Sequence, residues 1–323
     1  RNMAAYDTYL KGRVALRDRK PEAVTLLEQA TAADPNFAPA WAALAIAYQS
    51  ILESYQQGID AARKALALDP NNVDALNAMG AAMRQHRRWL EAEEQFDRAL
   101  AADPNSAELL EDYAEFLLLV GRTQDALAIT TRGMDIDSRL VPLALAHTDA
   151  LATNGQAGEA RQLAQELAET DPTITLFLLP IMLNPALQPS DVATMAPIEN
   201  ADDGLSWTAD MVDHVNRVIE GSSDVESIDA LKSHYEPANI QSVTSDLAYY
   251  RILPARIALV LAKELDYVIE QDIWWAKQLD LFPHELNWTP LFAELRAHPR
   301  FGEYLDAAGI VAYWDATEWT DWC

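Results

Sequence analysis

Three glutamates stand at a spacing that could bring their charges together. Glu108, Glu111 and Glu115 are separated by three and four residues, and this spacing places side chains on one face of an α-helix. A face of this kind can attract a basic or amphipathic peptide. The simpler interpretation is an exposed polar helix face without a ligand. Both interpretations require a helix across these residues.

The residue types that support catalysis form no convincing set. The sequence has no glycine-rich phosphate loop, no Gly-x-Ser-x-Gly motif and no His-Glu-x-x-His motif. Its six histidines stand singly, and a lone histidine on a helix is more often a packed or surface residue than a ligand or a base. The Asp202-Asp203-Gly204 segment lacks the spacing of a calcium loop. We therefore expect no enzyme activity, no catalytic residue, no metal site and no cofactor.

The chain is strongly acidic. Its 323 residues include 50 acidic and 24 basic side chains, which give a formal net charge of -26. Because this charge repels phosphate backbones at long range, we expect no nucleic-acid binding by this segment. No apolar run approaches the roughly 18–20 residues that a membrane helix needs, so we also expect no membrane insertion by this segment.

The two ends of the sequence leave the compartment open. The single cysteine, Cys323, excludes an internal disulfide framework. The chain opens with Arg1 instead of Met, and no charged segment followed by an apolar signal core is present. We expect a piece of a longer protein, located either in the cytoplasm or in the periplasmic part of a membrane-anchored protein.

A short sequence that ends helices recurs at a nearly constant spacing. Asp-Pro-Asn stands at residues 34–36, 69–71 and 103–105, and it is echoed at residues 137–138 and 171–172, in steps of 35, 34, 34 and 34 residues. The residue before a proline is pushed out of the α region, and the asparagine after it can cap the next helix. The period predicts five helical hairpins, at residues 4–36, 38–71, 73–105, 107–138 and 141–172.

The third of these units carries a specific pattern of large and small residues. Its first helix holds Leu76, Met79, Gly80 and Met83, and its second helix holds Ala92, Phe96 and Ala99 before Pro104. This stretch resembles a tetratricopeptide repeat. The resemblance implies an all-α fold, a right-handed superhelix of helix hairpins whose first helices line a concave groove. In that register the groove would present a set of polar side chains, and the predicted partner-binding residues are Gln49, Asn77, Arg84, Gln85, Glu108, Glu111, Glu115 and Asp149.

The period fades after residue 172. Four prolines predict a mostly irregular connector over residues 173–204. Apolar spacing of three and four then predicts helices at residues 205–219, 225–235, 247–265, 267–282, 288–295 and 301–308, a degenerate helical second half. Aromatic residues crowd its end, and we expect Tyr313, Trp314, Trp319 and Trp322 to fold back as a cap on the preceding helices.

The two ends of the chain carry a further resemblance. The start, Ala5-Tyr6-Asp7-Thr8-Tyr9-Leu10-Lys11-Gly12-Arg13, and the tail segments Pro299-Arg300-Phe301 and Trp319-Thr320-Asp321-Trp322-Cys323 look like the boundaries of tetratricopeptide regions in bacterial multidomain signalling proteins. Proteins of that type carry winged-helix or adenylate or guanylate cyclase domains on the amino side. The resemblance implies a sensory or docking region that is separate from its output domain.

These observations favour a non-catalytic interaction module that binds a basic or amphipathic protein or peptide in the groove. Two alternatives stay open. One is a small-ligand sensor with a pocket in the second half, lined by Trp274, Trp275 or Trp288. The other is a structural spacer that pairs two copies of the chain.

Overall fold

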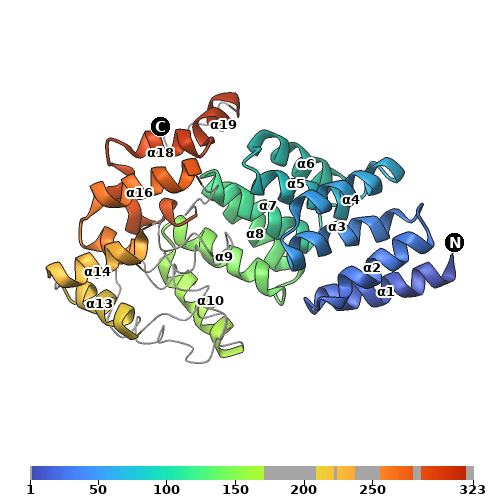
Figure 1. Ribbon diagram of the computed structural model, residues 1–323, viewed down its shortest axis with the longest axis horizontal. Coiled ribbons are helices and arrows are strands. Elements are labelled where there is room, and N and C mark those ends of the chain that lie inside the picture. Colours follow the sequence, from blue (N-terminus) through green and yellow to red (C-terminus); the bar gives the residue numbers. More distant parts are fainter. Residues whose placement is uncertain (1, 171–208, 222–223, 237–254, 279–284, 318–323) are drawn as a thin grey trace. The chain divides into compact units, whose positions relative to one another are not determined.

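The computed structural model describes residues 2–170, 209–221, 224–236, 255–278 and 285–317 (Figure 1). Within these ranges every regular element is a helix, which confirms the predicted all-α class. The chain divides into two compact units, one formed by Arg1–Phe116 with Ile129–Leu143, the other by Leu117–Ala128 with Ala144–Cys323. None of the described helices combines the length and the apolarity needed to cross a membrane.

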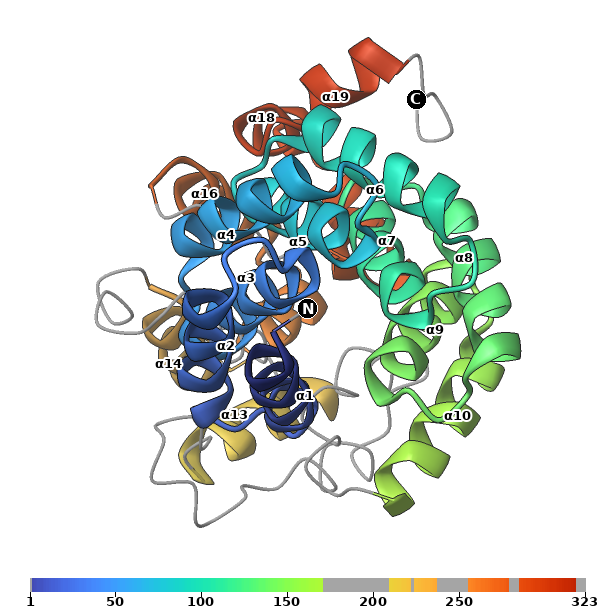
Figure 2. The same cartoon turned by 90° about the vertical axis from the view of Figure 1, so that its right-hand side faces the viewer.

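The first ten helices follow one another as five hairpins, in the order that the 34-residue period predicts. They are α1 Met3–Arg17, α2 Glu22–Ala33, α3 Ala38–Leu52, α4 Tyr55–Leu68, α5 Val73–Gln85, α6 Trp89–Ala102, α7 Ala107–Leu119, α8 Thr123–Ile136, α9 Val141–Thr153 and α10 Ala157–Thr170. In the first unit, α1 contacts α3 and α3 contacts α5. In Figure 2, α2 and α4 lie on the outer side of α1, α3 and α5. We call the surface formed by α1, α3, α5 and the start of α7 the first-helix face.

The Asp-Pro turns end their helices as expected, but the capping residue differs from the prediction. Asp34, Asp69 and Asp103 adopt extended backbone, with φ of -142°, -141° and -139°. Each aspartate accepts a hydrogen bond from the amide two residues later, at 3.2, 3.3 and 2.9 Å. The asparagine after each proline was predicted to cap the next helix. Where a side chain does cap the helix, it belongs to the residue one position later. Asn72 accepts from the Ala75 amide at 3.0 Å, and Ser106 accepts from the Leu109 amide at 3.3 Å.

Aromatic packing fixes α7 against the third hairpin. Phe96 of α6 is fully buried, and a Cβ atom on Gly80 of α5 would lie 2.8 Å from its ring. The Phe96 ring stacks on Tyr113 at 5.4 Å between centroids and lies 5.7 Å from Phe116. Close approach of α5 and α6 therefore depends on the missing side chain of Gly80, and the orientation of α7 depends on Phe96.

The second unit contains the described helices of the second half. These are α13 Ala209–Ile219, α14 Val225–Tyr235, a helix at residues 255–261, α16 Leu265–Gln278, η3 Glu285–Trp288, η4 Pro290–Phe292, α17 Ala293–Arg296, α18 Phe301–Ala307 and α19 Ile310–Thr317. Helix α16 begins at Leu265, whereas the apolar spacing predicts that one helix ends at residue 265 and the next begins at residue 267. The connector predicted at residues 173–204, and the predicted cap residues Trp319 and Trp322, lie outside the described residues.

The last described helix contacts the turn between α7 and α8. The indole Nε1 of Trp314 donates to the carbonyl of Val120 at 2.8 Å, and Arg122 donates to the hydroxyl of Tyr313 at 3.3 Å. Gly121, in the same turn, has a φ of +85°. Residues about 190 positions apart in the sequence are thus held together by polar contacts inside the second unit.

Candidate partner-binding site

Five polar side chains meet where α5 faces α7. Asn77 and Arg84 project from α5, and Glu111, Asp112 and Glu115 project from α7. One carboxylate oxygen from each of the three acids lies within 4.8 Å of the others. We call Glu111, Asp112 and Glu115 the carboxylate cluster. It lies on the first-helix face of the first unit.

Arg84 is the cation that the chain itself places against the cluster. Its Nη1 donates to the Glu115 carboxylate and, at 3.4 Å, to the Asp112 backbone carbonyl. Its Nη2 lies 3.7 Å from Asp112 Oδ1. The side chains of Arg84, Asp112 and Glu115 are 17%, 25% and 44% exposed, so solvent reaches the cluster from one side. One guanidinium faces three carboxylates, which leaves an excess of negative charge.

Asn77 donates a hydrogen bond to the cluster, and its side chain also carries an acceptor that has no partner among the described residues. Its side-chain amide is buried, with 7% of the residue exposed. Nδ2 donates to Asp112 Oδ2 at 2.6 Å. The other end of the amide, Oδ1, is buried and has no hydrogen-bond partner among the residues that the structure describes. A buried acceptor without a partner costs free energy unless a bound group satisfies it.

Burial, together with the neighbouring carboxylates, raises the pKa of two of the acids. Burial is the largest cause for Asp112, whose pKa rises to about 6 as Glu115 adds to the effect, although Arg84 and the hydrogen bond from Asn77 act in the other direction. Burial and then the charges of Asp112 and Glu115 raise the pKa of Glu111 well above its ordinary value. Burial alone would lower the pKa of Arg84, but the three carboxylates outweigh it and keep the guanidinium charged. The cluster therefore favours a proton or another cation.

The other predicted groove residues lie outside this group. Glu108 is exposed, one turn before Glu111 on α7. Gln49 is 8% exposed, and its Nε2 donates to the Ala78 carbonyl at 2.9 Å, so its amide joins α3 to α5. Gln85 is half-buried at the end of α5, and Asp149 lies on α9 in the second unit. The assignment of these four residues to a partner stays a prediction.

Sequence reasoning missed Asp112. This residue stands four positions after Glu108 and three before Glu115, so the spacing rule that selects the glutamates admits it as well. The pairing with Asn77 of the preceding hairpin could not be seen from spacing within a single helix.

A second polar group was also missed, and it lies in the core of the second unit. Arg256 and Asp272 are both fully buried and form a bidentate pair, with Nη2 2.6 Å from Oδ2 and Nε 3.1 Å from Oδ1. Tyr235 donates to the same carboxylate, and Asn287 accepts from Arg256 at 2.6 Å. Because all of these groups are buried and bond to one another, we interpret the network as structural.

The tryptophans proposed for a ligand pocket pack against other aromatic rings. Trp275 and Trp288 are 0% and 1% exposed. The Trp275 ring meets Trp274 edge-on at 5.4 Å, and the Trp288 ring lies 5.9 Å from Trp314. This packing gives the small-ligand alternative no support at these positions.

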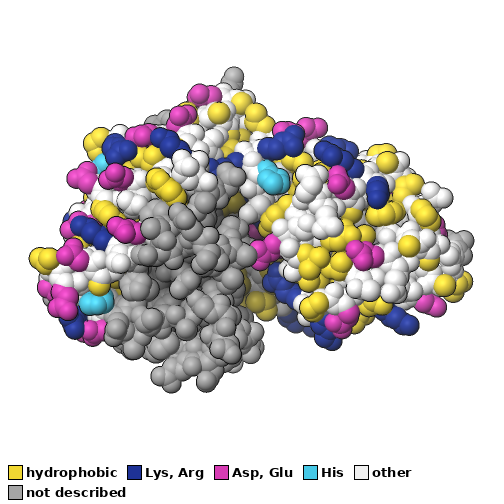
Figure 3. Space-filling model, in the orientation of Figure 1, with side chains coloured by type: hydrophobic (Ala, Val, Ile, Leu, Met, Phe, Trp, Pro, Cys, Tyr) yellow, Lys and Arg dark blue, Asp and Glu magenta, His cyan; other side chains and the backbone are white. Residues whose placement is uncertain are grey.

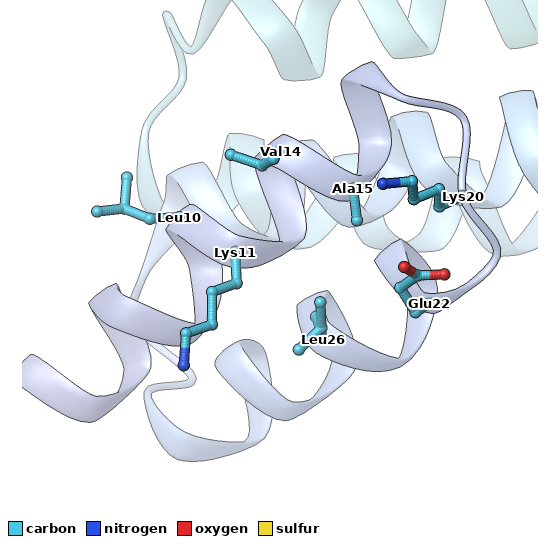
Figure 4. A pocket seen from close by; sticks show the side chains of 7 residues that line it. All are labelled: Leu10, Lys11, Val14, Ala15, Lys20, Glu22 and Leu26. Carbon is cyan, nitrogen blue, oxygen red and sulfur yellow. The ribbon is translucent and has the colours of Figure 1, made fainter.

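A shallow hollow lies elsewhere, between α1 and α2. It has a volume of about 420 Å³, and Figure 4 shows its lining by Leu10, Lys11, Val14, Ala15, Lys20, Glu22 and Leu26. Hydrophobic atoms are visible among charged ones over the N-terminal hairpins in Figure 3. Leu10 and Val14 are 44% and 52% exposed. The hollow is mainly apolar and lacks the convergent polar groups of the carboxylate cluster, so the cluster is the stronger candidate.

Comparisons with known proteins identify the repeats. Residues 61–94 and 96–128 match the family model of the tetratricopeptide repeat, and these ranges contain Asn77, Arg84 and the carboxylate cluster. The chain therefore contains tetratricopeptide repeats, and its hairpins form a tetratricopeptide-like helical solenoid. Tetratricopeptide arrays generally mediate protein–protein interactions and typically act as non-catalytic scaffolds. No match was found among curated proteins.

Solved structures of several repeat proteins are similar. PilF from Pseudomonas aeruginosa is 23% identical, with a TM-score of 0.44 over 56% of this chain and 83% of that chain. The protein TTC0263 from Thermus thermophilus is 17% identical, with a TM-score of 0.48 over 55% and 97%. YrrB, described as having an unusual peptide-binding site, is 15% identical, with a TM-score of 0.39 over 74% and 97%. At these identities and scores, they say nothing about what this chain binds.

Proposed function

We propose that this chain is a protein-interaction module that binds a basic or amphipathic segment of a partner on its first-helix face. The observation that carries the proposal is the carboxylate cluster, in which three acids converge on one guanidinium. The net charge of -26 adds long-range attraction for a basic partner and opposes binding to nucleic acids. The resemblance of the chain ends to bacterial signalling proteins supports a sensory or docking role in a larger protein.

The cluster suits a partner side chain better than a simple exposed helix face would. Exposed acids separated by a turn keep ordinary solvation and attract a partner only weakly. Here burial and the neighbouring carboxylates raise the pKa values of Glu111 and Asp112, so the chain itself stabilises the ionised cluster incompletely. A cation from a partner would supply the missing compensation, and partial exposure leaves a route for it.

Charge reversal on α7 tests the proposal. The probe is a fluorescent peptide of about 16 residues with lysine and leucine at helical spacing, together with an equal-length peptide in which glutamate replaces every lysine. We expect the double variant Glu108→Lys, Glu111→Lys to bind the basic peptide about 5- to 20-fold more weakly in an anisotropy titration, because an approaching cation loses its attraction and meets repulsion.

A matched control separates the site from overall charge. The double variant Glu53→Lys, Glu94→Lys makes the same change in net charge at two exposed residues outside the cluster, and we expect it to change the affinity by less than about 2-fold. Equal loss in both double variants, or equal binding of the basic and acidic peptides, would remove the assignment of the site.

A further inference from the structure

The carboxylate cluster offers a ligand more than negative charge, because it lies beside a buried hydrogen-bond acceptor. Asn77 Oδ1 is a buried acceptor without a partner among the described residues, and the Asn77 amide is oriented on the cluster by its 2.6 Å bond to Asp112. Oδ1 is bonded to the same carbon as the Nδ2 that donates to Asp112, so the acceptor lies beside the negative charge of the cluster. A ligand that satisfies both must carry positive charge and donate at least one hydrogen bond.

We propose that Asn77 and the carboxylate cluster form a recognition site for the ammonium group of a lysine side chain supplied by the partner. A primary ammonium carries three donors on a compact charge. Asn77 Oδ1 accepts one donor, and carboxylate oxygens of Glu111 and its neighbours accept the others. The inference rests on the proposed function, since a bound partner brings the lysine.

A guanidinium fits the site less well than an ammonium. Arg84 already contacts Glu115, the Asp112 carbonyl and, more distantly, the Asp112 carboxylate. A second planar guanidinium would have to find a further carboxylate edge for its five donors beside the first. The smaller ammonium needs three acceptors and no planar edge.

A divalent cation is also a poorer occupant. Calcium takes six to eight oxygen ligands, and magnesium demands a regular octahedron. Within the cluster, Asp112 Oδ2 is engaged by Asn77 and Glu115 by Arg84. A doubly charged ion beside these oxygens would also lie close to the Arg84 guanidinium, and this repulsion is twice that felt by an ammonium.

Ammonium binding at this site should depend on pH. The polar and charged groups that face Asp112 are Arg84 and the amide dipole of Asn77 from α5, and Glu108, Glu111 and Glu115 from α7. The pKa of Asp112 is raised to about 6 and that of Glu111 is raised well above its ordinary value, so both groups take up protons on acidification at a higher pH than ordinary carboxyls do. A proton and an ammonium compete for the same negative charge, and the affinity for lysine should therefore fall on acidification.

The test uses three basic peptides that differ at one central position, which is lysine, arginine or N,N,N-trimethyl-lysine. Trimethyl-lysine keeps the charge and removes the donors. With the wild-type chain at about pH 7.5 we expect the lysine peptide to bind about 5- to 10-fold more tightly than either of the others. This preference should shrink at about pH 5.5, below the pKa of Asp112.

Two variants connect the preference to the site. Asn77→Leu keeps the branching of the side chain, with a larger volume, and removes the acceptor. Glu111→Gln, which keeps the side-chain size and removes the charge, is the second variant should the first unfold. In both variants the preference for lysine should fall below about 2-fold, whereas Asn71→Leu, the same change at an exposed residue in the turn before α5, should preserve it.

Four outcomes are informative. Loss of the lysine preference in the two site variants supports the inference. Equal wild-type affinities for lysine and trimethyl-lysine overturn it and leave the proposed function intact. Calorimetric binding of Ca²⁺ or Mn²⁺ alone, abolished by Asn77→Leu, also overturns it in favour of a metal site. Failure of all three peptides to bind removes the proposed function together with the inference.

Discussion

The Arg84 group and the Arg256–Asp272 pair differ in burial. Arg84 and Asp112 are 17% and 25% exposed at the side chain and belong to a cluster with too many acids. Arg256 and Asp272 are 0% exposed and balance each other, with Tyr235 and Asn287 supplying further hydrogen bonds. A partly exposed, unbalanced group can exchange its ionic partners with a ligand. A buried, balanced group can only be kept or broken.

Breaking the buried pair should destabilise the second unit strongly. We expect Arg256→Met to lower the free energy of unfolding by about 3–5 kcal/mol, because it leaves the Asp272 carboxylate buried without its cation. The matched control is Arg300→Met, which removes an exposed ion pair with Glu303 and should leave the free energy of unfolding nearly unchanged. Urea denaturation, monitored by hydrogen exchange in α16, would measure the free energy of unfolding of both variants.

The double variant Arg256→Met, Asp272→Leu tests the reason for that loss. Apolar residues of similar size can replace a buried ion pair at little cost, so this variant should recover much of the stability lost in the single variant. A single variant as stable as the control would show that the pair contributes little.

At the scale of the helices, much of the architecture could be predicted from sequence. The Asp-Pro turns at residues 34–35, 69–70 and 103–104 place the ends of the first three hairpins, because proline restricts the residue before it whatever the surroundings. The capping atoms were harder to assign, since Asp34, Asp69 and Asp103 use their own side chains in the turn and leave Asn72 or Ser106 to cap the next helix. Such choices depend on backbone angles that the residue types alone do not determine.

Only the part of the candidate site that lies on one helix could be predicted from the sequence. Spacing identified the acidic face of α7, because i, i+3 and i+4 positions are neighbours on any helix. It could not show that Asn77 of another hairpin bonds Asp112, or that Tyr235, Arg256, Asp272 and Asn287 converge from segments 16 to 37 residues apart. Contacts between elements depend on packing that a local pattern does not contain.

Two glycines give a direct test of helix packing. Gly80→Ala would place a Cβ atom 2.8 Å from the buried Phe96 ring, and we expect a loss of about 1–3 kcal/mol despite the better helix propensity of alanine. Gly158→Ala, near the start of α10, meets nothing within 4 Å and should be neutral or stabilise by up to about 1 kcal/mol. Thermal unfolding of both variants measures the difference, and similar midpoints would contradict the assigned role of Gly80.

Contacts between distant parts of the sequence connect the repeats to the end of the chain. Trp314 and Tyr313 of α19 meet the turn between α7 and α8 through Val120 and Arg122. That turn follows directly after the helix that carries the carboxylate cluster. The last described helix thus contacts a turn more than 190 residues earlier in the chain, and the predicted role of Tyr313 and Trp314 as a cap stays a prediction.

Removing the indole of Trp314 should loosen that turn selectively. Trp314→Ala deletes the 2.8 Å hydrogen bond to Val120 and the ring packed on Trp288, so we expect amide exchange across residues 118–128 to accelerate about 10-fold or more, measured by mass spectrometry. Asp315→Ala, exposed on the same helix, should leave that exchange unchanged. Exchange in α3 and α4 should not respond to either variant, because these helices belong to the first unit. Uniform acceleration along the whole chain would instead mean that Trp314 contributes to global stability and not to this local contact.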